Sequence, residues 1–212
     1  MTTQMKRITL SLIMLLCCSI GHPVDDKESV RFTADVPFGK GTIKMDVILE
    51  SNWGWGWGTG SQKLDAPCIP ADTKGELFIP DSITVPDGSK MPVTWISRGS
   101  FQTCQNLTQV HLPKSITHIS DLSFSGCTSL REITFPDSLE WIYPRAFIGC
   151  TALRRVHFLS ATPPKCYNND NFDEATYATA TLVVPVEAAE AYLNNPLTYR
   201  FRYHAETLPI YK

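Results

Sequence analysis

Three cysteines have a spacing that could support chemistry. Cys104, Cys127 and Cys150 lie 23 residues apart, and thiols can form disulfides, ligate metals or act as nucleophiles. In stacked repeats their Cα atoms would be about 4.8 Å apart, within disulfide range, but a disulfide also holds its Cβ atoms at about 3.8 Å. Stacked Cα–Cβ bonds run parallel, and three equivalent thiols cannot all pair. We therefore expect buried free thiols, because a reactive thiolate needs a cationic, partly exposed setting.

Polar side chains with the same spacing form a candidate binding surface. Three columns recur at equivalent positions: His111, Thr134 and His157; Gln109, Glu132 and Arg155; Thr108, Arg131 and Arg154. Repeat arrays commonly bind other molecules across such faces, and the mixed charges suit a polar protein or glycan. The alternative is a solvated face without a ligand. His111 and His157 would be about 9.6 Å apart, too far for one metal ion, so we expect no metal and no cofactor.

A second candidate surface is the segment in which Trp53, Trp55 and Trp57 alternate with glycine. In a strand all three indoles would lie on one face and could stack on sugar rings. The same indoles could instead cover an open end of the core, and the glycines also suit a flexible loop. All three readings stay open.

The 23-residue period also covers six apolar positions. The equivalent residues are Ile96, Ile119 and Ile142; Phe101, Phe124 and Phe147; Cys104, Cys127 and Cys150; Leu107, Leu130 and Leu153; Val110, Ile133 and Val156; Leu112, Phe135 and Phe158. One unit cannot bury six apolar side chains alone, whereas stacked units share one continuous core. The sequence therefore predicts an α/β solenoid, which we expect to be short and right-handed.

The strands of this solenoid follow from alternation. Residues 110–112 read apolar, polar, apolar, as do 133–135 and 156–158, and Pro113 and Pro136 end two of these strands. The strand-plus-proline pattern returns at 77–80 and 182–185, which predicts about five parallel strands. We expect short helical turns over 121–126 and 144–149, and a hairpin-like excursion around 85–92, where one coil carries about ten extra residues.

Both ends of a solenoid need caps. Strands at 30–32 and 43–49, around the turn at 39–41, predict a hairpin over the first coil. A short helix over 186–194 would place Ala189 and Tyr192 on the core, with the tail from 196 folded over the same end. The predicted division is 22–74 for the N-terminal cap with the Trp/Gly stretch, 75–185 for the solenoid and 186–212 for the C-terminal cap. Cys68 and Cys166 belong to opposite caps and should not meet.

The unit I-x4-F-x2-C-x2-L-x2-[VI]-x-[LF]-P resembles the BspA-type leucine-rich repeat family of bacterial surface proteins. Residues 119–130, ISDLSFSGCTSL, carry the resemblance most clearly. Residues 162–164 and 182–185, together with Tyr192, resemble that family's C-terminal cap. The resemblance implies an extracellular protein, mostly of Gram-negative bacteria, that adheres to host matrix proteins or other cells.

Residues 1–21 read as a signal peptide. Lys6 and Arg7 precede an apolar run over 8–20, which is short for a membrane span of roughly 20 residues. Cleavage before His22 would release a secreted chain without a membrane span. Lipid attachment through Cys17 or Cys18 is the alternative, although Leu16 is larger than the residue that usually precedes a lipidated cysteine.

The composition narrows the function further. The net charge of −2 gives no basic field for nucleic acid, and no nucleophile–base pair, metal spacing or phosphate loop is found. We expect an exported, non-enzymatic binding or adhesion protein, secreted or at the cell surface, whose partner is a host or bacterial surface protein or a glycan. Two alternatives remain: glycan binding by the Trp53/Trp55/Trp57 stripe, and a structural or assembly component without a soluble ligand. The sequence leaves the oligomeric state open.

Overall fold

The computed structural model describes residues 29–38, 41–50, 69, 72–84, 88 and 90–207. Our predictions for the signal peptide with Cys17 and Cys18, for Trp53, Trp55 and Trp57, and for Cys68 lie outside these residues. The division of the chain after residues 21, 74 and 185 also stays a prediction.

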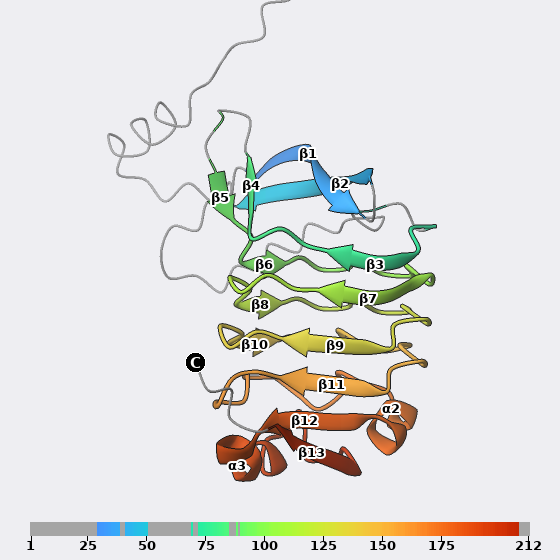
Figure 1. The fold of residues 1–212 in the computed structure, drawn as a ribbon, viewed down its shortest axis with the longest axis vertical. Coiled ribbons are helices and arrows are strands. Elements are labelled where there is room, and N and C mark those ends of the chain that lie inside the picture. The colour runs from blue at the N-terminus through green and yellow to red at the C-terminus, as the bar shows by residue number, and fades with distance from the viewer. Residues whose placement is uncertain are drawn as a thin grey trace, which may run out of the picture.

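Six parallel strands form the main sheet of the solenoid. Their order is β3 (Gly75–Phe78), β7 (Leu107–His111), β9 (Glu132–Phe135), β11 (Arg155–Phe158), β12 (Thr181–Pro185) and β13 (Tyr203–Thr207), stacked as a ladder in Figure 1. The predicted solenoid and its strands are confirmed. The estimate of about five strands omitted β13, because the C-terminal tail adds a strand beside β12 in addition to folding over that end.

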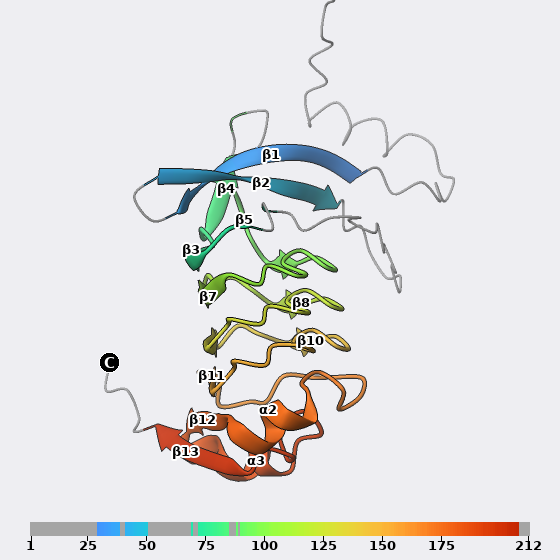
Figure 2. The same cartoon turned by 90° about the vertical axis from the view of Figure 1, so that its right-hand side faces the viewer.

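A second, three-stranded sheet lies on the other side of each coil. It contains β6 (Trp95–Ile96), β8 (His118–Ile119) and β10 (Trp141–Ile142), which pair in parallel and in register. Figure 2 shows β8 and β10 on the side of the coils opposite β7 and β11. The isoleucine column was predicted to be apolar, and its members are fully or almost fully buried. Its strand character was not predicted, because two residues are too few to show alternation.

The helical turns predicted over 121–126 and 144–149 are wrong. Leu122 and Arg145 have φ angles of +56° and +58°, far from the helical value of about −63°. The N–H of Phe124 donates to the carbonyl of Ala146 in the next coil at 2.8 Å. Hydrogen bonds between coils thus take the place of the i→i−4 bonds of a helix.

The core consists of the predicted apolar columns. Phe101, Phe124 and Phe147 stack at centroid distances of 5.0 and 5.1 Å. Phe172, in the C-terminal cap, continues the column at 5.2 Å from Phe147. All four rings are buried, so the phenylalanine column joins the solenoid to its cap.

The three repeated cysteines are buried free thiols, as predicted. The Cys127 thiol donates to the carbonyl of Phe101 at 3.1 Å, and the Cys150 thiol donates to that of Phe124 at 3.2 Å. Burial raises the pKa of Cys104 to about 11 and that of Cys150 to about 12. These thiols therefore stay protonated near neutral pH and fill a small core position.

The N-terminal end carries the predicted hairpin. Strands β1 (Ser29–Phe38) and β2 (Gly41–Glu50) pair antiparallel and are longer than predicted; β1 lies against β3 (Figure 1). The extra residues of the first coil form a second antiparallel pair, β4 (Ser82–Thr84) with β5 (Lys90–Pro92). The predicted excursion is therefore confirmed, with its first strand starting at Ser82.

The C-terminal cap contains the predicted helix and one that was not predicted. The 3-10 helix η1 (Val186–Ala188) leads into α3 (Ala189–Leu193). Tyr192 is fully buried, Ala189 packs beside the core, and the Tyr192 hydroxyl donates to the Ser160 carbonyl at 3.0 Å. Helix α2 (Glu174–Thr179) lies between β11 and β12, where the repeat spacing lengthens from 23 to 26 residues.

Candidate functional site

The sheet register aligns the predicted polar columns. His111, Thr134 and His157 are paired neighbours across β7, β9 and β11, and Gln109, Glu132 and Arg155 form the next aligned row. The third column lies just before these positions, where the N–H of Arg131 donates to the Thr108 carbonyl and that of Arg154 to the Arg131 carbonyl. Side chains far apart in sequence therefore share one face of the main sheet.

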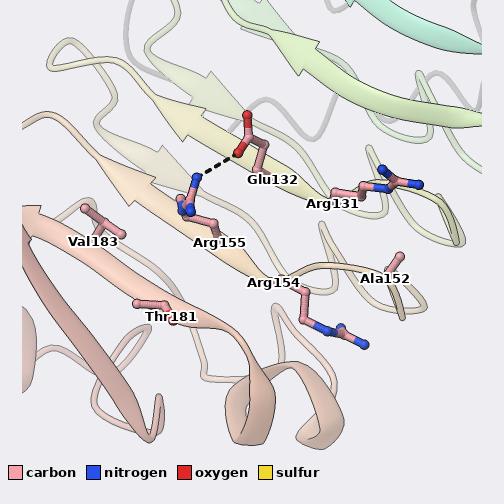
Figure 3. Close-up of a pocket in the computed structure, with 7 residues that line it drawn as sticks. All are labelled: Arg131, Glu132, Ala152, Arg154, Arg155, Thr181 and Val183. Carbon is pink, nitrogen blue, oxygen red and sulfur yellow. Dashed lines mark hydrogen bonds and ion pairs between the residues drawn. The ribbon is translucent and has the colours of Figure 1, made fainter.

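Part of this face is hollowed into a shallow depression of about 490 Å³, here called the arginine hollow. Figure 3 shows its lining residues: Arg131, Glu132, Ala152, Arg154, Arg155, Thr181 and Val183. Glu132 and Arg155 form an ion pair at 3.2 Å across adjacent strands. Arg131 and Arg154 then leave the hollow with a net positive charge.

The two remaining arginines differ in how they are held. Arg154 donates from Nη1 to the carbonyls of Thr151 and Leu153, both at 2.9 Å, which orients its guanidinium. No acceptor contacts the Arg131 guanidinium within the described part of the chain. Both side chains are exposed and keep donors for a ligand, since a guanidinium has five N–H groups in a planar fork.

The repeat and its strand geometry can be compared with known proteins. A sequence model described as "BspA type Leucine rich repeat region (6 copies)" matches residues 81–184. This part of the chain belongs to the BspA-type leucine-rich repeat family. That family is one of bacterial surface proteins, which gives the chain a surface or binding role in general terms.

One solved structure that resembles the chain is a leucine-rich repeat protein from Bacteroides capillosus. The two sequences are 23% identical, the match covers 59% of this chain and 98% of that chain, and the TM-score is 0.33. No curated protein matches the chain. Among the described residues, no helix has the length and apolar character needed to cross a membrane.

The two histidines of the BspA-type repeat face lie in different surroundings. Burial lowers the pKa of His157, Arg155 lowers it further, and Glu132 opposes the shift. His157 is therefore neutral near pH 7 and offers a hydrogen bond rather than a charge. His111 stacks on Phe78 at 3.9 Å and lies 3.3 Å from the Glu76 carboxylate, so it belongs to a separate cluster at the first coil.

Sequence reasoning missed three residues of the arginine hollow. Thr181 and Val183 pair in register with Arg155 and His157, so extending the columns across the 26-residue step would have found them. Ala152 carries no periodic signal. Its small side chain lines the hollow between the two free arginines (Figure 3).

Proposed function

We propose that this protein is exported to a bacterial cell surface and binds an acidic protein or glycan there, without catalysing a reaction. The arginine hollow on the outer face of the main sheet carries this proposal. Export is supported by the character of residues 1–21, and either free secretion or lipid attachment through Cys17 or Cys18 fits a surface role. Adhesion to host matrix or to other cells is the biological setting that the family favours.

The ligand chemistry follows from the guanidinium groups. Arg131 and Arg154 come from adjacent coils, and each can hold a carboxylate or sulfate through two parallel N–H bonds. The Glu132 carboxylate would repel such a ligand, but its ion pair with Arg155 offsets that charge. Thr181 adds a hydroxyl that can donate or accept.

The chemistry of this face supports binding rather than catalysis. His157 is the nearest candidate base, and in the described residues no hydrogen bond joins it to the hydroxyl of Thr134 or Thr181. The repeated thiols are buried beneath the sheet with raised pKa values, so they are poor nucleophiles.

The test compares two double variants with the unchanged protein on an array of acidic glycans and a panel of matrix proteins. Arg131→Ala with Arg154→Ala removes both free guanidinium groups of the hollow. Lys90→Ala with Lys114→Ala removes the same charge from exposed positions outside it. We expect the arginine pair to weaken binding at least tenfold and the lysine pair to leave it unchanged. Equal binding by all three proteins would refute the proposal.

A further inference from the structure

A second surface lies on the outer side of the three-stranded sheet. Ile96, Ile119 and Ile142 point into the core, so the residues beside them point outward. Five rings gather there, and we call them the aromatic platform: Trp95, His118, Trp141, Tyr143 and Tyr167. This face is opposite the arginine hollow (Figures 1 and 2).

The rings form one continuous surface across four coils. Trp95 and His118 stack at 4.1 Å with an interplanar angle of 6°. Tyr143 joins the two ends of the platform, with its centroid 5.9 Å from that of Trp95 and 5.5 Å from that of Tyr167. Trp141 lies 5.2 Å from Tyr167. Four coils at about 4.8 Å per step give a length of about 14 Å.

The platform remains open to solvent. Trp95 is 41% exposed and Tyr167 is 50% exposed, and these are the rings of the first and last coils. Trp95 stacks on His118 with one face, and no ring in the described part of the chain covers its other face. Outward positions of a solenoid sheet are ordinarily polar, and contiguous exposed apolar patches mark binding surfaces.

Polar groups border these rings in balanced numbers. Arg98, Arg145 and Lys165 supply positive charge, and Asp121, Glu140 and Asp170 supply negative charge. Lys165 lies over the Trp141 ring at 5.4 Å, and the Trp95 indole N–H donates to the Ser120 hydroxyl at 2.6 Å. This border therefore has donors and acceptors but no net charge.

We propose that the aromatic platform binds a neutral oligosaccharide chain. A pyranose ring has an apolar C–H face, which packs on aromatic rings, and a hydroxyl edge, which needs donors and acceptors. The length of about 14 Å favours several linked sugars over a single one. The balanced charge disfavours an anionic membrane, which attracts clusters of lysine and arginine. The site is separate from the arginine hollow and does not depend on its ligand.

Titration calorimetry of the full chain against cellotetraose, xylotetraose, mannotetraose and chitotetraose tests this proposal. We expect at least one to bind, Trp95→Ala with Trp141→Ala to weaken it at least tenfold, and Phe78→Ala to leave it unchanged. Phe78 is the matched control because it is 49% exposed on the other sheet. Circular dichroism checks that each variant is folded.

Three results would overturn the proposal. The first is no binding of any of the four tetrasaccharides. The second is equal binding by the tryptophan variant and the unchanged chain, which would place the saccharide elsewhere. The third is a dimer that the tryptophan variant converts to a monomer in light scattering, because the platform would then be an interface between two copies. Loss of binding in Arg131→Ala with Arg154→Ala would likewise transfer the saccharide to the hollow.

Discussion

Replacing Phe124 by alanine tests whether the stacked columns form one continuous core. The Phe124 ring is fully buried and stacks on Phe101 at 5.0 Å and on Phe147 at 5.1 Å. Removing a buried phenylalanine side chain costs about 3–5 kcal/mol through lost transfer free energy and the cavity that remains. Each kcal/mol lowers Tm by about 2–4 °C in a chain of this size. We therefore expect Phe124→Ala to lower Tm by roughly 6–20 °C.

Differential scanning calorimetry and urea unfolding measure this effect. Phe78→Ala is the matched control, because Phe78 is 49% exposed and stacks on one ring only, that of His111. Its loss should cost about 1 kcal/mol or less, since exposed aromatic pairs contribute about 0.5–1.5 kcal/mol beyond burial. If Phe124→Ala were as mild as Phe78→Ala, the ring column would not be a shared core.

Three further predictions concern the thiols, one glycine and the tryptophan stripe. In the native protein a thiol reagent should modify half-buried Cys166 before the buried Cys104, Cys127 and Cys150, and unfolding should expose all four. Because burial raises the pKa of Cys104 to about 11 and that of Cys150 to about 12, the folded state binds these protons more tightly than the unfolded chain. The urea midpoint should then fall as pH rises from about 9 to 12, and a flat midpoint would contradict the burial of the thiols. Gly149→Ala should lower stability by more than the 1–2 kcal/mol of a left-handed residue, because its φ is +79° and a new Cβ would lie 3.1 Å from the Gly126 backbone; Gly88→Ala, at +88° with open space, should cost less in the same unfolding assay. Replacing Trp53, Trp55 and Trp57 together by alanine should abolish carbohydrate binding if that stripe is the glycan site, and unchanged binding would exclude it.

The repeat in the sequence was sufficient to predict the main sheet. Each strand has buried residues at alternate positions, and each column recurs at one spacing, so pattern and register agree. The helical turns were predicted wrongly because inward residues three apart, such as Phe124 and Cys127, suit a helix as well as a turn. Which one forms depends on hydrogen bonds to the next coil, which local sequence does not reveal.

The missed elements share a physical cause. Strands β6, β8 and β10 are too short to alternate, and β13 pairs with β12 through backbone bonds that need no apolar period. Helix α2 has six residues, and its buried Thr176 and Tyr177 give no full amphipathic pattern. Tertiary contacts decide all of these elements.

The candidate site was predictable in part. The register of the polar columns follows from the repeat, whereas the shape of the arginine hollow depends on the small Ala152 and on the contacts of Arg154 with nearby carbonyls. Trp95, His118 and Trp141 also lie 23 residues apart. Reading this column beside the isoleucines would have revealed the aromatic platform.

The most direct test of the proposed function is the affinity for the strongest acidic ligand from the array, measured against salt concentration. Charge-assisted hydrogen bonds contribute about 1.5–3 kcal/mol each, and 1.4 kcal/mol is about tenfold in affinity. The unchanged protein should bind more weakly as salt rises, and Arg131→Ala with Arg154→Ala should bind at least tenfold more weakly at low salt. Equal affinities and no dependence on salt would contradict binding through the arginine hollow.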